Sequence, residues 1–333
     1  MDMGVSLTLV LLILIALAFD FMNGLHDAAN SIATIVSTRV LKPQYAVVWA
    51  AFFNFAAFFI FGVHVANTVG KGIVDPKLVD DALIFGALMG AITWNAVTWW
   101  GGIPSSSSHA LIGGIVGAGV AKAGFSAVIW GGLSKTVIAI VVSPLTGFLL
   151  ALLLVLFVSW SFVKASPAFA DGFFRKSQLV SAALYSLGHG SNDAQKTAGL
   201  IAVLLYSHGV YSEFTVPGWV ILSCYTVMGM GTLMGGWRIV HTMGSKITRL
   251  TPMQGSCAET AGALTLFGAT YLGIPVSTTH TITSAIVGVG AARRVSAVRW
   301  NVATGIVYAW VITMPAAALV AALFYWVGTL FLG

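Results

Sequence analysis

The sequence predicts an all-α polytopic membrane protein built from two inverted-topology repeats, with about 10–12 membrane helical elements. Of its 333 residues, 58% are hydrophobic and only 8% are charged, against roughly a quarter charged in an ordinary soluble domain. Apolar runs meet or approach the ~20 residues that a spanning helix needs, at 5–19, 45–63, 139–158 and 302–332. Backbone groups in lipid must bond internally, so these runs fit helices and do not fit barrel strands.

Three pairs of segments recur in the same order, which predicts a duplication. The segment "GLHDAANS" at Gly24 corresponds to "GSNDAQKT" at Gly190, 166 positions later. "IPSSSSHALIGG" at Ile103 corresponds to "IPVSTTHTITSA" at Ile274, and "SAVIW" at 126 corresponds to "SAVRW" at 296, at offsets of 171 and 170. The first repeat is therefore predicted to span residues 1–165 and the second 166–333.

Each half is expected to contain the same elements in the same order. A long helix broken around the Gly-x-x-Asp motif comes first, followed by one further span. A hairpin tipped by the proline-hydroxyl motif comes next, and a last span interrupted near a proline ends the half. Because a hairpin returns to its own side of the membrane, each half crosses an odd number of times, and the second half is inverted.

Charge patterning orients the chain. On the predicted topology one face collects eleven basic residues and the other face three, which places the basic face in the cytoplasm and both termini outside, in a multi-pass protein of the cell inner (plasma) membrane. Scattered basic residues of this kind favour the lipid bilayer over nucleic acid as the partner, despite a pI near 9.4. The hairpins then open to opposite sides, and their tips approach each other near the midplane. The basic residues are Arg39, Lys42, Lys164, Arg175, Lys176, Arg238, Lys246, Arg249, Arg293, Arg294 and Arg299.

Ionisable side chains within the apolar segments are the first candidates for function, because charge at membrane depth is costly and usually faces a transport route. Asp27 and Asp193 occupy the same position in both repeats, each three residues after a motif glycine. For Asp20 and Lys135, which have no charged counterpart in the other half, a buried ion pair or snorkelling near the interface explains the sequence equally well.

The proline-hydroxyl motifs are candidates for anion binding. A proline has no N–H and interrupts a helix, so the residues after it can start a new helix whose first N–H groups are unpaired. Such a helix end attracts anions, although serine and threonine can also serve only as caps. The predicted phosphate-binding residues are Ser105, Ser106, Ser107, Ser277, Thr278, Thr279, Asp27, Asp193, Asn192 and Lys196.

These motifs together resemble the inorganic phosphate transporter (PiT) family, whose first-half signature is close to Gly-x-Asn-Asp-x-x-Asn. The resemblance spans both halves and implies symport of phosphate with sodium or protons, with no cofactor besides the coupling ions. It carries over Asp27, Asn30, Asn192, Asp193 and the hydroxyl runs as binding residues. Lys196 stands where the first repeat has Asn30. His26 stands where many members have Asn, and this departure leaves the coupling cation open.

Sodium is the preferred coupling ion, because amide, hydroxyl and carbonyl oxygens form a suitable shell for a hard cation. The alternatives are proton coupling, a sulfate or other oxyanion permease of the same plan, an anion channel, and a membrane-embedded serine hydrolase using His109 or His280. Duplicated motifs in opposed orientations favour a transporter over an enzyme. A homodimer is allowed as a partner, but no surface is indicated. The predicted sodium ligands are Asp27, Asn30, Ser108, Asn192, Asp193 and Thr279, with Glu259 as a candidate for an additional cation or gating site, or else a proton acceptor.

Overall fold

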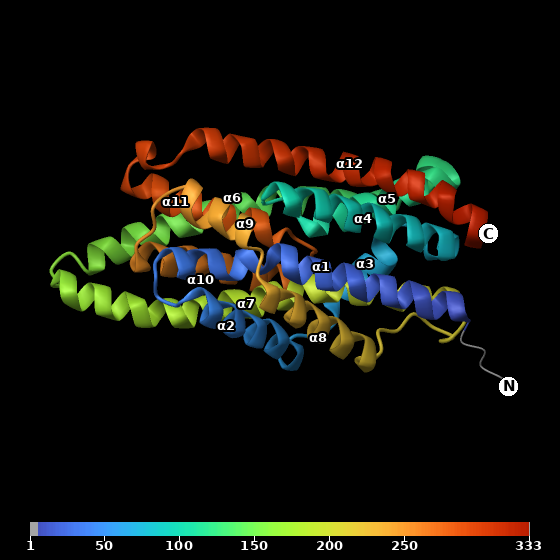
Figure 1. Ribbon diagram of the computed structural model, residues 1–333, viewed down its shortest axis with the longest axis horizontal. Helices are drawn as coiled ribbons and strands as arrows, with labels where there is room; N and C mark the ends of the chain where they lie inside the picture. The colour runs from blue at the N-terminus through green and yellow to red at the C-terminus, as the bar shows by residue number, and fades with distance from the viewer. Residues whose placement is uncertain (1–5, 333) are drawn as a thin grey trace.

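The chain is a bundle of α-helices in a computed structural model that describes residues 6–332 (Figure 1). The only β-structure among these residues is one isolated bridge between Val74 and Val128, so the predicted all-α class is confirmed. The first half contains α1 (Leu7–Ser37), α2 (Pro43–Ala56), α3 (His64–Gly72), α4 (Asp81–Gly101), α5 (Ser107–Ala123) and α6 (Trp130–Ser161). The second half contains α7 (Pro167–Ser207), α8 (Gly218–Met234), α9 (Trp237–His241), α10 (Pro252–Tyr271), α11 (Thr278–Arg293) and α12 (Trp300–Leu332).

The long apolar helices qualify as membrane spans. Within the described residues, five helices are long and apolar enough to cross a membrane: α1, α4, α5, α6 and α12. Two bent pairs raise this number to as many as seven, because α2 and α3 together, and α8 and α9 together, pass the same test with bends of 82° and 63°. The remaining long helices α7, α10 and α11 carry the polar motifs of the second half.

The two predicted hairpins enter the bundle from opposite ends (Figure 1). In the first, α4 and α5 pack against each other, and in the second α10 and α11 do so. Each hairpin turns at a glycine in the left-handed region, Gly102 with φ +63° and Gly273 with φ +67°, where a side chain would be strained. Both glycines precede an Ile-Pro pair, so the same turn chemistry shapes both tips.

The expected breaks in the motif helices are absent. Helices α1 and α7 run without interruption through Asp27 and Asp193. The motif glycines serve close packing instead: a Cβ at Gly24 would overlap the carbonyl oxygen of Met228, and a Cβ at Gly190 that of Asn54. Helices α6 and α12 likewise continue through their internal prolines, which neighbouring helices allow in membrane spans.

Replacing Gly190 with Ala is therefore expected to destabilise the bundle, because α7 would have to move away from the backbone of α2 at Asn54. Overpacking of this kind costs about 1–3 kcal/mol. Gly172→Ala on the same helix is the matched control, since a Cβ there meets nothing within 4 Å. The free energy of unfolding in mixed micelles should be lower for Gly190→Ala than for Gly172→Ala. Equal free energies would contradict the packing role of Gly190.

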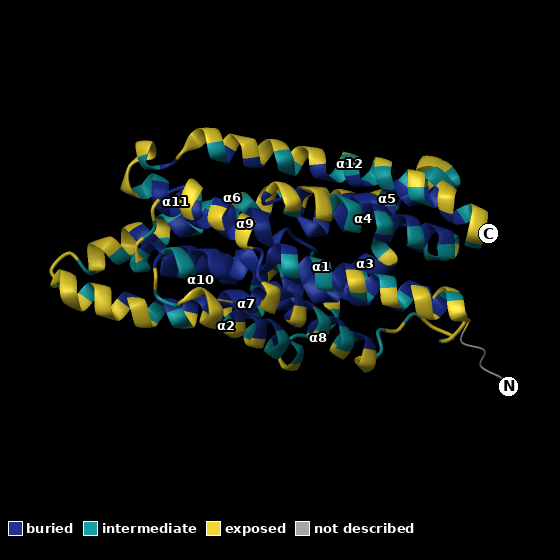
Figure 2. Cartoon of the chain, in the orientation of Figure 1, coloured by how far each residue is buried: buried dark blue, intermediate teal, exposed yellow. Residues whose placement is uncertain are grey.

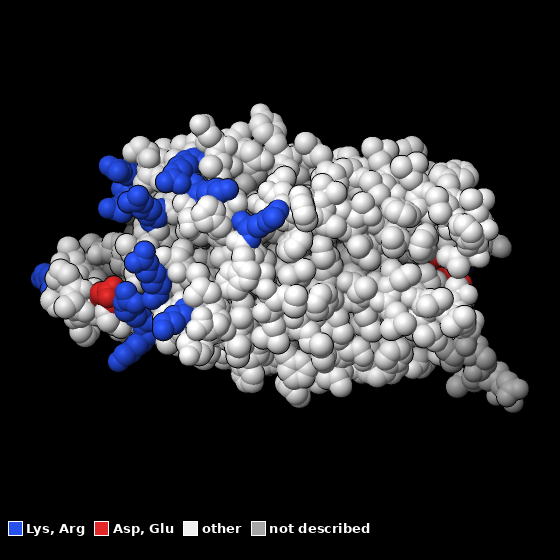
Figure 3. All heavy atoms as spheres, in the orientation of Figure 1, with Lys and Arg blue, Asp and Glu red and all other residues white. Residues whose placement is uncertain are grey.

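Burial and charge are distributed as a membrane protein requires. Exposed apolar side chains cover the outer faces of α6 and α12, while the middle of α1 and α7 is buried (Figure 2). On the face shown in Figure 3, Lys and Arg side chains gather toward the end opposite the described start of α1 and the end of α12. This asymmetry agrees with the predicted charge bias, and the orientation across the membrane stays a prediction.

Candidate functional site

The tips of the two hairpins meet inside the bundle. Helices α5 and α11 begin there, and the ring centroids of His109 and His280 lie 4.3 Å apart, edge to face. Ser106 accepts a hydrogen bond from the backbone N–H of His109 at 3.2 Å, and Ser277 accepts one from that of His280 at 3.1 Å. These two hydroxyls therefore cap their helices. Capping is the role that the sequence offered as the alternative to anion binding. The N–H groups of the preceding residues in each first turn have no intrahelical acceptor.

Each motif aspartate contacts the tip of one hairpin. The hydroxyl of Ser107 donates to Asp27 Oδ1 at 3.2 Å, and the hydroxyl of Thr278 donates to Asp193 Oδ2 at 3.0 Å. Ser107 and Thr278 occupy the same position in the two repeats, as do the two aspartates. The same contact therefore occurs twice, once in each half of the site.

The two halves of the site are in direct contact with each other. Oxygens of Asp27 and Asp193 and a ring nitrogen of His189 all lie within 4.8 Å of one another. Both carboxylates are at most 1% exposed. Two buried carboxylates at this separation repel each other unless cations or donors compensate them, so the arrangement is suited to binding positive charge.

Histidines contact both aspartates. His26 Nδ1 lies 2.7 Å from Asp27 Oδ1, and its Nε2 lies 3.0 Å from the hydroxyl of Thr98. His189 Nε2 lies 3.3 Å from Asp193 Oδ2, while its Nδ1 lies 3.1 Å from Asn54 Oδ1. His26 thus bonds Asp27 while Thr98 holds its other ring nitrogen, whereas His189 Nε2 lies near Asp193 without a hydrogen bond.

Asn30 and Lys196 make equivalent contacts across the site. The amide nitrogen of Asn30 donates to the hydroxyl of Thr279 at 2.9 Å and to that of Thr278 at 3.2 Å. Lys196 Nζ donates to the hydroxyl of Ser108 at 2.5 Å, and Ser108 is the repeat counterpart of Thr279. Lys196 Nζ also donates to Asp193 Oδ1 at 2.6 Å and to the carbonyl of Val276 at 2.7 Å.

Ser105 and Asn192 hold the hairpin tips in place. The hydroxyl of Ser105 donates to Thr98 at 2.9 Å on the α4 side of the tip. The amide nitrogen of Asn192 donates to Thr270 and to the carbonyl of Ile274, both at 3.2 Å, and its Oδ1 accepts from the N–H of Val276 at 3.2 Å. These two predicted binding residues have their polar atoms engaged with the protein in this conformation.

Glu259 lies in a separate buried cluster. Its carboxylate accepts hydrogen bonds from Thr34 at 2.6 Å, from Gln178 at 3.0 Å and from Ser181 at 2.5 Å. Thr34 follows Asp27 by seven residues on α1, which is about 10 Å along the helix. The structure does not bring Glu259 to the central aspartates.

Two contacts of the site escaped the sequence analysis. His189 stands four residues before Asp193 and thus on the same helix face, a spacing that could have identified it. The hydroxyl of Tyr185 donates to the carbonyl of Thr278 at 2.9 Å, and no local pattern indicates that contact.

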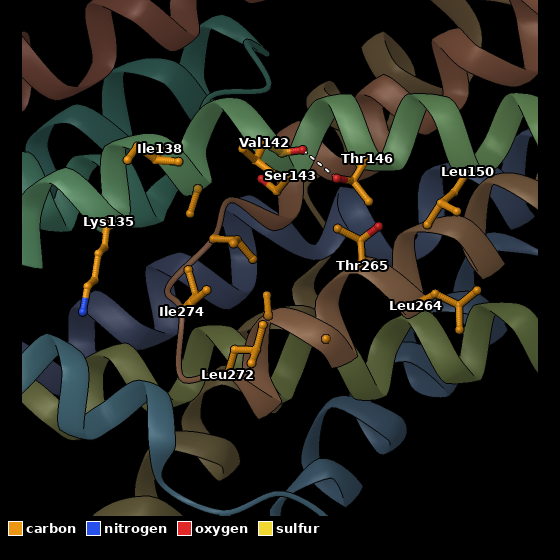
Figure 4. A pocket seen from close by; sticks show the side chains of 14 residues that line it. Lys135, Ile138, Val142, Ser143, Thr146, Leu150, Leu264, Thr265, Leu272 and Ile274 are labelled. Carbon is orange, nitrogen blue, oxygen red and sulfur yellow. Dashed lines mark hydrogen bonds between the residues drawn. The ribbon is translucent and has the colours of Figure 1, made fainter.

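A groove between α6 and α10 has a different chemistry (Figure 4). It encloses about 480 Å³ and is lined mainly by apolar side chains, among them Ile138, Leu264 and Leu272. An anion needs donors, which this lining scarcely offers. The groove lies at the flank of the second hairpin, and the polar site lies between the tips.

Comparisons with known proteins give the family. A sequence model described as the phosphate transporter family matches residues 23–321. A probable low-affinity inorganic phosphate transporter of Rhizobium meliloti (strain 1021) is 71% identical over 97% of each chain, and one of Bacillus subtilis (strain 168) is 45% identical over 98% of each. A solved structure described as the sodium-dependent phosphate transporter has a TM-score of 0.89 at 27% identity and covers 98% of this chain and 100% of its own. These relatives are carriers and not enzymes, so the chain is a multi-pass transporter of the plasma membrane and belongs to the phosphate transporter family.

Proposed function

We propose that this chain imports inorganic phosphate by symport with sodium, and that phosphate binds near the midplane between the two hairpin tips and the two aspartate helices. One observation carries the proposal: the first turns of α5 and α11 meet beside Asp27 and Asp193, with Ser107 and Thr278 bonded to them. Free amides and the positive ends of two helices attract an oxyanion. Bound phosphate would take over the hydroxyl donors that now face the carboxylates.

The aspartates account for a preference for phosphate over sulfate. Phosphate keeps at least one proton at neutral pH and can donate it to a carboxylate, whereas sulfate has none to donate. A site that leaves buried polar groups unpaired rejects the ligand that cannot satisfy them. Asp27 and Asp193 are both buried, so sulfate would leave their carboxylates without the donor that phosphate supplies.

Sodium coupling is supported by oxygen atoms on the Asp27 side. The Asp27 carboxylate, the Thr279 hydroxyl and the Oδ1 of Asn30 are hard-oxygen ligands of the kind that small cations take. Within residues 6–332, Asn30 Oδ1 is buried without a hydrogen-bond partner. A cation there offsets the repulsion between carboxylate and phosphate, so each ligand raises the affinity for the other. The relative with the solved structure is described as sodium-dependent.

Proton coupling is the second candidate, because each aspartate has an imidazole within 3.3 Å. In that case the His26–Asp27 and His189–Asp193 pairs would carry the proton. The hydrogen bond between His26 and Asp27 fits this role, but within the described residues His189 Nε2 makes no hydrogen bond to Asp193. Proton coupling also leaves the Oδ1 of Asn30 unpaired, and for these reasons sodium is preferred.

Uptake of labelled phosphate into proteoliposomes tests the proposal. An inward sodium gradient at fixed pH is expected to raise the initial rate at subsaturating phosphate, because bound sodium raises the affinity for phosphate about 5- to 150-fold, the range of ordinary coupling energies. Excess sulfate should leave that rate nearly unchanged. Uptake that does not respond to sodium but follows an inward proton gradient would show that protons are the coupling ion. Strong inhibition by sulfate would point to a general oxyanion permease.

A further inference from the structure

Lys196 is held by oxygen atoms as a bound cation would be. Its ammonium contacts a carboxylate oxygen of Asp193, the hydroxyl of Ser108 and the backbone carbonyl of Val276, at 2.5 to 2.7 Å. These atoms come from α7 and from the tips of both hairpins. An ammonium has three N–H donors, and all three are used here, in a side chain that is only 3% exposed.

The repeat counterpart of Lys196 has no charge. Asn30 stands at the equivalent position of the first half, and its amide meets Thr279, the counterpart of Ser108. Asp27, the counterpart of Asp193, therefore has no lysine beside it on α1. The unpaired Oδ1 of Asn30 lies on this same side, so the first half offers an acceptor where the second half supplies a cation.

We infer that Lys196 is a tethered cation that fills the second of two equivalent cation sites, so that phosphate moves with one sodium ion fewer than a symmetric pair of sites would take. The inference rests on the proposed sodium symport. Asp193 stays compensated throughout the cycle, including the return of the empty carrier, because Lys196 cannot dissociate. Only the Asp27 side exchanges its cation with the solution.

A lysine that served only as an ion-pair partner would need Asp193 alone, three residues earlier on the same helix. The additional acceptors from both hairpin tips are what distinguishes this arrangement. A direct phosphate ligand would need a free N–H, and in this conformation the ammonium has none left. Lys196 therefore acts on phosphate through its charge and through the position it gives to the tips.

The test is Lys196→Asn, which copies the first half into the second. Wild type and variant are compared in proteoliposomes by simultaneous uptake of labelled sodium and labelled phosphate at fixed pH. The variant is expected to take up one more sodium ion per phosphate and to depend more steeply on sodium. Lys135→Asn is the control, because Lys135 is an exposed lysine on α6 beside the apolar groove, and its sodium-to-phosphate ratio should equal that of wild type. An unchanged ratio in a transporting Lys196→Asn variant would overturn the inference.

A second measurement decides the matter if the variant does not transport. Thermal unfolding of the purified protein in detergent is followed in sodium chloride and in choline chloride, without phosphate. Sodium should raise the midpoint of Lys196→Asn by at least about 2 °C more than that of wild type, because a ligand that binds only the folded state stabilises it. No added stabilisation would overturn the inference. Wild-type uptake that ignores sodium would refute the proposed function instead, and the unfolding comparison would still decide whether Lys196 fills a sodium site.

Discussion

Replacing Asp27 with Asn is expected to lower sodium-driven phosphate uptake by about 100-fold or more. The change keeps the shape of the side chain but removes the charge that faces His26 and Ser107 and that the proposed sodium ion would neutralise. Loss of one partner from a buried charged contact costs about 2–5 kcal/mol, and each 1.4 kcal/mol is a factor of ten. Initial rates of labelled phosphate uptake in proteoliposomes measure the effect.

Asp171→Asn is the matched control for that variant. Asp171 is an exposed residue near the start of α7, where it pairs with Arg175 at 2.9 Å. Exposed pairs contribute little, so this variant should transport at nearly the wild-type rate. An Asp27→Asn variant that is equally active would show that the central carboxylate is dispensable.

Replacing Asp193 with Asn should affect folding as well as transport. The change leaves the Lys196 ammonium buried with only neutral acceptors, among them the Ser108 hydroxyl and the Val276 carbonyl. Breaking a buried ion pair from one side costs about 3–5 kcal/mol, a large part of the stability of an ordinary protein. The free energy of unfolding in mixed micelles measures the loss, and added sodium should not restore it, because the uncompensated charge is positive.

The double variant Asp193→Asn with Lys196→Gln separates charge from packing. Since neither side chain is then charged, most of the lost stability should return, while transport should stay absent. Equal stability of the single and double variants would contradict a charge origin for the loss. The exposed pair of Asp171 and Arg175 again supplies the comparison, with an expected loss below about 1 kcal/mol for Asp171→Asn.

Much of the site could be predicted from sequence because its parts are duplicated. The recurrence of Asp27 at Asp193 and of Ser107 at Thr278 predicted that two similar half-sites would face each other. Hairpin tips that enter from opposite sides can only meet near the middle of the bundle. The structure confirms that meeting through the contact of His109 with His280.

The remainder depended on packing that a local pattern does not encode. The glycines of the motifs looked like helix breakers, yet Gly24 and Gly190 let neighbouring backbones approach α1 and α7, and only the neighbours reveal that use. Glu259 stands in the second hairpin with no acidic counterpart in the first, which made it a candidate for an additional site. The hydrogen-bond partners of Glu259 include Gln178, 81 residues away in the sequence, and Thr34, 225 residues away. Local sequence spacing therefore could not predict this separate cluster.

The occluded arrangement bears on how the carrier works. The aspartates, hydroxyls and Lys196 are all at most 4% exposed, so neither end of the bundle gives solvent ready access to them in this conformation. The proposed symport would therefore require the tips to separate from one side at a time. Because Lys196 bonds both tips, opening toward either side must break at least one of its contacts.

The most direct test of the proposed site is a structure determined with phosphate and sodium bound. Tetrahedral density is expected between the first turns of α5 and α11, within hydrogen-bonding distance of the Ser107 and Thr278 hydroxyls, with a cation beside Asp27 and Asn30. Phosphate bound elsewhere, for example against the basic end of the bundle and away from both aspartates, would contradict it.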